Sequence, residues 1–276
     1  MAAFSISQLA RKHAPWSFSK MEMAESCPAQ FRHKVILKTA AAPAPSDTKV
    51  GIVAHEILEH RVKGTSEPEA RKVALEKTPL TTQERESLRM LGESMEDFLA
   101  RFDGFCKREG VEEILSEKDW GFTDTYARAG FFADDVYFRG KLDLGAVTRS
   151  KDLFFIDHKS GMAKPLERDQ KKRQQLQSYA VLALANLPGI AGVRGGIHFM
   201  QGSPELRVQW TPYIPAERVR ELFVPWLFGR INSAADNLTE PFEARPAKKW
   251  PCAWCSYQSS CPEYLALKAR WDAAQG

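Results

Sequence analysis

Apolar residues recur at helical spacing in two stretches of the chain, residues 49–63 and residues 81–109. In the first stretch, the apolar positions that share one face are Val50, Val53, Ile57 and Leu58. In the second stretch they are Leu88, Leu91, Met95, Phe98, Leu99 and Phe102. Because a period of three to four residues buries one side of a helix, the pattern predicts two helices after the Pro- and Ala-rich break at 41–48.

The middle of the chain changes its period. Short runs rich in β-branched and aromatic residues predict strands at 112–122, 136–148 and 153–161, the last two joined by the polar turn RSKD. A long helix opened by Pro165 is predicted over 165–187, followed by strands near 193–200 and 206–214 and a helix near 216–236. This succession of helices, sequential strands and a crossover helix predicts an α/β fold.

Two of the predicted strands carry charged residues that can meet. Residues two apart in a strand share a face, so Asp157 and Lys159 point the same way, while Asp143 points away from Leu142 and Leu144. If the two strands form a hairpin, Asp143 and Asp157 converge beside Lys159. A single strand carboxylate is usually solvated, but Asp157 ends an apolar run, where burial is expected.

Two carboxylates and an ammonium group suit the hydrolysis of phosphodiesters. Carboxylate oxygens are hard ligands that hold Mg2+ or Mn2+. Such an ion polarises a phosphoryl group and lowers the pKa of a bound water. The lysine can position that water and stabilise negative charge on the phosphate.

A second cluster of reactive side chains lies near the end of the chain, in PCAWCSYQSSC. Its cysteines, Cys252, Cys255 and Cys261, have a spacing typical of metal-binding thiolates, and a four-thiolate site needs one further ligand. The remaining cysteines are Cys27 and Cys106. A buried free cysteine is common, and this description suits Cys106.

Composition and charge narrow the class of protein only slightly. The chain is 43% hydrophobic and 27% charged, with a net charge of +4, which permits a nucleic-acid partner without requiring one. The sequence contains no transmembrane-length apolar run and no secretory signal pattern, so we expect a cytoplasmic protein with no membrane partner and no structural disulfides.

Three segments resemble known motifs: GKLDLG at 140–145, FFIDHKSG at 154–161 and QLQSYA at 175–180. They are similar to the RecB-like branch of the PD-(D/E)-x-K nuclease superfamily, which includes the AddB nuclease domain and the exonucleases of CRISPR adaptation. The resemblance implies a restriction-endonuclease-like core with a mixed central sheet flanked by helices. It assigns catalytic roles to Asp143, Asp157, Lys159, Gln175 and Tyr179.

The same resemblance implies the ligands of the divalent metal. They are His55, Asp143, Asp157 and the backbone carbonyl of His158. Glu117 matches an auxiliary acid of some relatives. Taken alone, His55 is a packed or solvent-facing helix residue, and only the set of motifs makes it a ligand. Basic residues at the start of the 165–187 helix are candidates for phosphate contacts, although such runs often only face solvent: Arg168, Lys171, Lys172 and Arg173.

Iron-sulfur members of this branch join one early cysteine to three in the C-terminal tail. By that resemblance, Cys27, Cys252, Cys255 and Cys261 hold a 4Fe-4S cluster. Structural Zn2+ is the alternative, because four thiolates suit both. We therefore expect one nuclease domain over 1–276, in which residues 1–48 and 237–276 form a clasp around the core.

The expected function is that of a metal-dependent DNA nuclease, most simply an exonuclease, in DNA repair or recombination. A catalytically silent nucleic-acid-binding module is the rival, but His55, Asp143, Asp157 and Lys159 are all intact. A structural subunit of a helicase-nuclease complex is a third candidate. The chain has no G-x4-G-K-[ST] phosphate loop, so a helicase motor would be a separate partner.

Overall fold

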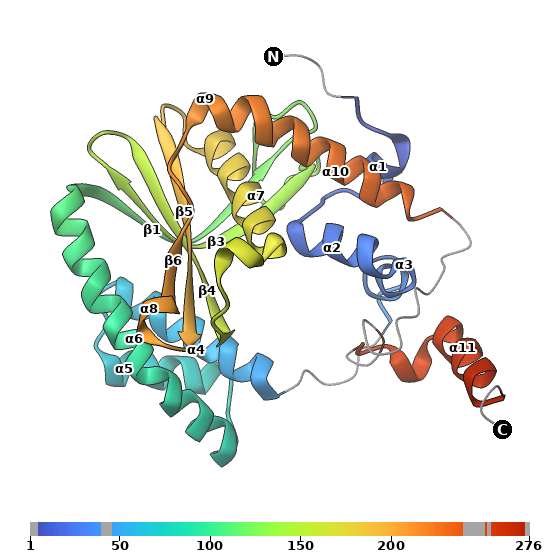
Figure 1. Cartoon of the computed structure of the whole chain (residues 1–276), viewed down its shortest axis with the longest axis horizontal. Coiled ribbons are helices and arrows are strands. Elements are labelled where there is room, and N and C mark those ends of the chain that lie inside the picture. Colours follow the sequence, from blue (N-terminus) through green and yellow to red (C-terminus); the bar gives the residue numbers. More distant parts are fainter. Residues whose placement is uncertain (1–4, 40–45, 240–251, 253–254, 274–276) are drawn as a thin grey trace. The chain divides into compact units, whose positions relative to one another are not determined.

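The structure is a computed structural model that describes residues 5–39, 46–239, 252 and 255–273 (Figure 1). It divides into two compact units. Residues 45–225 form the sheet unit, and residues 1–44 with 226–276 form the small unit. Parts of the expected clasp segments, 1–48 and 237–276, lie outside the described residues.

The sheet unit contains seven strands and most of the longer helices. The strands are β1 (Val111–Phe122), β2 (Arg128–Ala129), β3 (Phe138–Thr148), β4 (Asp152–Met162), β5 (Gly192–Gln201), β6 (Val208–Trp210) and β7 (Ile214–Pro215). The helices are α4 (Ser46–Val62), α5 (Glu67–Lys77), α6 (Thr82–Glu109), α7 (Gln170–Asn186), α8 (Pro204–Arg207) and α9 (Ala216–Arg218). A 3-10 turn covers Leu166–Arg168, and a π-helical turn covers Val219–Phe223.

The strands form one mixed sheet in the order β2-β1-β3-β4-β5-β6, with β7 also pairing with β5. Among the described strands, only the β4–β5 pair is parallel, and α7 connects these two strands. The structure thus confirms the predicted mixed sheet with its crossover helix and flanking helices (Figure 1).

Helices pack on both faces of this sheet. On one face, α4, α5 and α6 form an apolar core with Leu144, Ile156 and Met200, one residue from each of three neighbouring strands. On the other face lies α7, whose Leu176 packs near Phe155 where Gly195 leaves room. Alternate residues of β4 therefore face different helical layers, because the strand period is two.

Local signals explain where the helices begin. The α6 helix starts with a capping box, in which the Thr81 hydroxyl accepts from the Glu84 N–H and the Glu84 carboxylate accepts from the Thr81 N–H. The α7 helix begins at Gln170 because the Asp169 carboxylate accepts from the Lys172 N–H at 3.1 Å. The prediction that Pro165 opens this helix was wrong, since Pro165 precedes the separate 3-10 turn.

Two other predictions need correction. The single strand expected over 206–214 is instead divided among the end of α8, the three-residue β6 and the first residue of β7. Pro212 lies between the two strands and has no N–H to donate to a strand partner. The α5 helix was not predicted. Its buried residues are Ala70 and Ala74, small side chains that leave a weak periodic signal.

The small unit is mainly helical. Its elements are α1 (Gln8–Lys12), α2 (Phe18–Ser26), α3 (Pro28–Phe31), a π-helical turn (Arg32–Ile36), most of α10 (Val224–Asp236), a 3-10 turn (Gln258–Ser260) and α11 (Pro262–Ala273). Arg230 of α10 binds Glu22 and Glu25 of α2 at 2.8 and 2.7 Å. No helix among the described residues is both long and apolar enough to span a membrane.

Candidate active site

Asp143 and Asp157 lie at the end of the β3–β4 ladder. The last registered pair is Leu144 with Ile156, and the next pair in the same antiparallel register would be Asp143 with Asp157. In place of continued pairing, the backbone N–H of His158 donates to Asp143 Oδ2 at 2.8 Å. The sequence-predicted convergence of the two acids is therefore present in the structure.

Two side chains bind Asp157, and a third contacts one of these two. Its side chain is only 4% exposed, and its Oδ2 lies 2.6 Å from the Lys159 ammonium. Its Oδ1 accepts from Gln175 Nε2 at 3.1 Å, and the same amide lies 3.4 Å from the Tyr179 hydroxyl. Gln175 and Tyr179 are one turn apart on α7, so the Tyr179 hydroxyl lies beside the Gln175 amide that reaches the carboxylate.

His55 and Glu117 approach Asp143 from other elements. His55 Nδ1, on α4, lies 3.5 Å from Asp143 Oδ2. Glu117, on β1, forms an ion pair with Lys141. The ligand atoms of His55, Glu117 and Asp143 lie within 4.8 Å of one another, which is close enough for one ion to contact all three.

Two glycines allow the helices to come this close. A Cβ on Gly51 of α4 would lie 2.8 Å from the Ser160 hydroxyl oxygen of β4, and His55 is one turn further along the helix. A Cβ on Gly140 of β3 would lie 2.7 Å from Leu182 and 3.3 Å from the Tyr179 ring of α7. Larger residues here would push α4 or α7 away from the acids.

The electrostatics of the site favour a bound cation. Burial, followed by the like charge of Asp157, raises the pKa of Asp143 to about 8. Burial also raises the pKa of Glu117. Burial lowers the pKa of His55, which keeps the imidazole neutral and able to donate its lone pair to a metal. Crowded acids beside a neutral imidazole are a donor set that fits a divalent ion.

His158 is part of a buried polar chain behind the acids. Its Nδ1 lies 3.0 Å from Nδ1 of His198, whose Nε2 lies 3.2 Å from the Ser94 hydroxyl. Ser94 in turn donates to the Phe199 carbonyl at 3.4 Å. Burial lowers the pKa of both histidines, that of His198 to about 4, so both rings stay neutral.

Sequence reasoning missed His198 and Ser94. His158 and His198 are register partners in the parallel β4–β5 pair. Their contact could be predicted only once the order of the strands in the sheet was known.

The basic residues predicted to contact phosphates have mixed surroundings. Lys172 is bound to Asp169 at 2.5 Å, and Arg173 donates to the Leu166 and Glu167 carbonyls, so both serve the start of α7. Arg168 and Lys171 are exposed.

The other predicted metal site lies in the small unit. Cys27, Cys252 and Cys261 are buried, Cys255 is half-buried, and all are free thiols. Burial raises the pKa of the Cys252, Cys255 and Cys261 thiols, and the Cys27 sulfur raises each of them further. Cys27 and Cys261 pack in one small buried cluster, although 234 residues separate them in the sequence. Cys106 belongs to the sheet unit, on α6.

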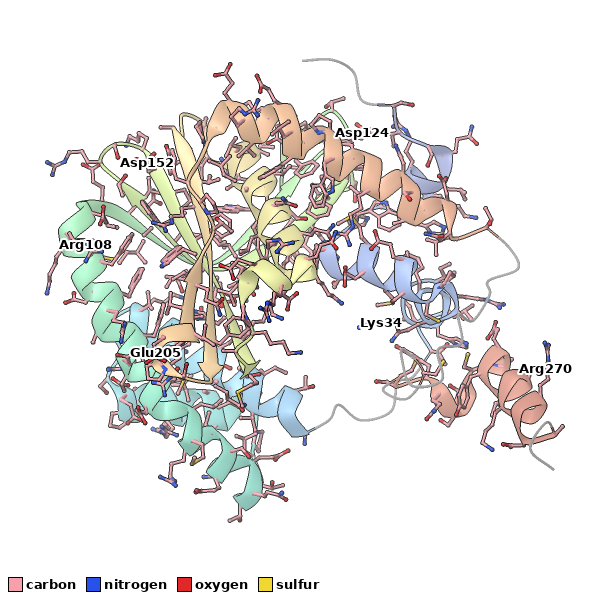
Figure 2. All side chains as sticks on the ribbon, in the orientation of Figure 1. Lys34, Arg108, Asp124, Asp152, Glu205 and Arg270 are labelled. Atoms are coloured by element: carbon pink, nitrogen blue, oxygen red, sulfur yellow. The ribbon has the colours of Figure 1, made fainter. Side chains whose placement is uncertain are left out.

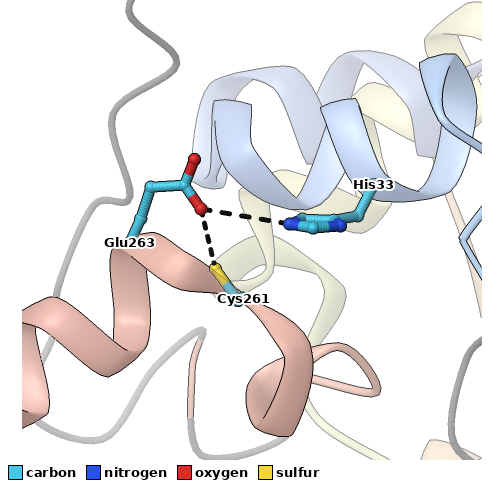
Figure 3. A group of neighbouring side chains, drawn as sticks. All are labelled: His33, Cys261 and Glu263. Carbon is cyan, nitrogen blue, oxygen red and sulfur yellow. Dashed lines mark hydrogen bonds and ion pairs between the residues drawn. The ribbon is translucent and has the colours of Figure 1, made fainter.

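Two residues beside Cys261 were not predicted. Glu263 Oε2 lies 3.2 Å from Cys261 Sγ and 3.9 Å from His33 Nε2 (Figure 3). His33 is buried and stacks on Tyr257. Three potential ligand atoms therefore meet here. The spacing of the cysteines does not point to His33, which lies six residues after Cys27 in a different helical turn.

The arrangement of acids and lysine on a mixed sheet is that of a nuclease fold, and sequence comparison agrees. Residues 15–262 match the PD-(D/E)XK nuclease superfamily, and the chain belongs to this superfamily.

Among solved structures, a proposed exonuclease from Eubacterium rectale is similar at 11% identity and a TM-score of 0.48, with 84% of this chain and 85% of that chain covered. The protein SSO0001 is similar at 16% identity and a TM-score of 0.34, with 77% and 85% covered. No curated protein matches the chain.

Proposed function

We propose that this chain is a divalent-metal-dependent deoxyribonuclease of the RecB-like, iron-sulfur type, and that it acts as an exonuclease. One observation carries the proposal. Asp143 and Asp157 face each other where the β3–β4 ladder ends, with Lys159 bound to Asp157. Membership of the PD-(D/E)XK superfamily supports nuclease chemistry at these residues.

The residues suited to hold Mg2+ or Mn2+ are Asp143, Asp157, His55 and the backbone carbonyl of His158, with Glu117 as an auxiliary acid. When bound, the ion polarises the phosphoryl group and lowers the pKa of a bound water. An imidazole nitrogen among oxygen ligands suits Mn2+ better than Mg2+. The neutral state of His55 and the proximity of its Nδ1 to Asp143 support its place in this set.

The remaining side chains hold the acids and balance charge. The Lys159 ammonium, anchored by Asp157, provides positive charge for the negative charge that develops on the phosphate. Gln175 orients Asp157 by donating to Oδ1, so that Oδ2 stays directed at Lys159. Tyr179 fixes the Gln175 amide in turn.

The small unit supplies a structural cluster in this proposal. Four thiolates suit either a 4Fe-4S cluster or tetrahedral zinc. Cys27, Cys252, Cys255 and Cys261 would hold the group and join the two ends of the chain.

A cleavage assay tests the proposal. End-labelled single-stranded and double-stranded DNA, together with closed circular DNA, should be incubated with the protein and Mg2+ or Mn2+. We expect mononucleotides or short products from the linear substrates and no cutting of the circle. The near-isosteric Asp157→Asn variant should lose activity by about a thousandfold or more. The exposed loop variant Asp134→Asn is the matched control. Full activity in Asp157→Asn would refute the assigned site.

A further inference from the structure

Positive charge is unevenly divided between the two units. Residues 1–44 and 226–276 contain 12 Lys and Arg against 7 Asp and Glu, whereas residues 45–225 contain 27 against 28. The excess positive charge of the whole protein therefore belongs to the small unit, and the unit with the catalytic acids is close to neutral. A nuclease must still attract and hold a polyanion.

The small unit contains a basic hollow of about 810 Å³. Its cationic lining consists of Lys12, His13, Lys20, Arg32 and Lys38, and none of its described lining residues is acidic. Lys12 and Lys38 are exposed. Lys34, in the same π-helical turn as Arg32, adds a further exposed cation close by in sequence (Figure 2).

The cationic residues Lys12, His13 and Lys20 share the lining of the hollow. Burial lowers the pKa of His13, and the charges of Lys12 and Lys20 lower it further. Lys20 is fixed by the Pro15 carbonyl at 2.6 Å and the His13 carbonyl at 3.4 Å. Like charges that lie close together repel one another, and a bound anion offsets this repulsion.

Three described acids of the small unit form ion pairs with arginines. Glu22 and Glu25 bind Arg230 of α10, and Glu263 lies 3.4 Å from Arg32 at one side of the hollow. Part of the Arg32 charge is thereby offset, but Lys12 and Lys38 keep the hollow cationic.

The hollow also has an apolar wall. Ile36 and Leu37 are 41% and 53% exposed, although both are large aliphatic residues, and Val35 lies beside them in the lining. The hollow therefore offers aliphatic as well as cationic contacts. A nucleic-acid strand has phosphates for the lysines and sugar and base faces for the aliphatic wall.

We infer that this basic hollow of the small unit binds the phosphate backbone of the DNA substrate, so that one unit holds the strand and the other cleaves it. The inference rests on the proposed deoxyribonuclease function and extends it with a substrate-holding site. It also gives the cysteine cluster a reason to exist, because the cluster would stabilise the unit that carries this site.

The test uses the full chain and separates binding from cleavage. Lys12 and Lys38 are the positions to change, because Lys20 and Arg32 also hold local structure. The double variant Lys12→Gln/Lys38→Gln removes two charges. The matched control Lys72→Gln/Lys107→Gln removes two exposed lysines from helices of the sheet unit. The probe is a fluorescein-labelled single-stranded 30-mer in EDTA, with its duplex form in parallel, and Kd is measured by anisotropy over a series of KCl concentrations.

For the single strand, we expect the Lys12→Gln/Lys38→Gln variant to bind roughly tenfold more weakly at moderate salt. The slope of log K against log[KCl] should fall in magnitude by about 1.4, because each phosphate contact contributes about 0.7. The control should stay within about twofold of wild type at each salt concentration. The duplex should show a loss in the same direction.

Other outcomes overturn the inference in distinguishable ways. If the wild type cleaves and binds DNA but both double variants bind it equally, the hollow is not the DNA site and the proposed function stands. If vesicles containing phosphatidylserine bind the wild type and lose binding in Lys12→Gln/Lys38→Gln while DNA affinity is unchanged, the hollow contacts anionic lipid instead. A wild type that neither binds nor cleaves DNA would refute the proposed function as well.

Discussion

Asp143 and Asp157 occupy facing positions at the exact point where two antiparallel strands stop pairing, and the N–H of His158 donates to Asp143 instead of continuing the ladder. Of these two acids, Asp143 also lies within reach of His55 and Glu117, so that one ion could contact all three. Burial of Asp143, followed by the like charge of Asp157, raises the pKa of Asp143 to about 8.

Metal binding should therefore release a proton from Asp143. At pH 7 the metal-free carboxyl is below its pKa of about 8 and carries a proton, whereas the metal-bound carboxylate cannot. Calorimetric titration of Mn2+ at pH 7 in two buffers of different ionisation enthalpy should show release of about one proton, and at pH 9 almost none. Asp143→Asn should remove the buffer dependence. Equal heats in both buffers at pH 7 for the wild type would contradict the assignment.

Lys159 should matter for turnover more than for metal affinity. Its ammonium lies 2.6 Å from Asp157. A protonated amine has no lone pair to bind the ion, but its positive charge can stabilise the negative charge of the transition state. Lys159→Met should lower kcat by about a hundredfold or more while Mn2+ still binds. Lys141→Met is the informative comparison, because Lys141 pairs with Glu117 and its loss should change metal affinity more than kcat.

Local patterns in the sequence predicted part of the fold and of the candidate site. Strand periodicity placed Asp157 and Lys159 on one face and predicted the hairpin that brings Asp143 to them, because a two-residue period and a short turn are local properties. The His158–His198 contact was beyond reach, since it depends on β4 and β5 being parallel neighbours. The α5 helix was missed for a different reason, as its buried alanines give almost no periodic contrast.

His55 should set the metal preference. As a nitrogen ligand it favours Mn2+ over Mg2+, so His55→Ala should reduce Mn2+-supported cleavage more than Mg2+-supported cleavage. His60→Ala, five residues further along the same helix, is the control and should behave like wild type. Rates with both ions for the three proteins decide the matter. Unchanged rates with both ions in His55→Ala would make His55 a packing residue.

The chain of His158, His198 and Ser94 should make stability depend on pH. His198 has a folded pKa of about 4 against an unfolded value near 6.5, so the unfolded state binds more protons between these values. The contribution of His198 to the free energy of unfolding is fully present above pH 6.5. It is lost as the pH falls towards 4, at about 1.4 kcal/mol per pH unit. Asp143 has the opposite dependence, so the test belongs in an Asp143→Asn background.

In that background, urea unfolding at pH 7.5, 6.5 and 5.5 should show stability decreasing with acidification, and a further His198→Asn change should make the decrease shallower. Ser94→Ala should cost about 1–3 kcal/mol at pH 7.5, because it leaves the Nε2 of a fully buried histidine without its partner. Parallel pH profiles with and without His198 would rule out this titration.

The four cysteines of the small unit should act as one site although they come from both ends of the chain. Protein purified without oxygen should be brown and contain about four irons, if Cys27, Cys252, Cys255 and Cys261 hold a 4Fe-4S cluster. Cys27→Ala should lose iron as fully as Cys255→Ala, whereas Cys106→Ala on α6 should retain it.

Because closing so long a loop is entropically costly and the cluster offsets that cost, losing the cluster should also expose the small unit to protease. Iron content, visible absorbance and limited proteolysis measure these effects. Colourless protein that contains one zinc ion would show that zinc, and not an iron-sulfur cluster, joins the two ends of the chain. Full metal occupancy in Cys27→Ala would show that the two ends are not joined through this residue.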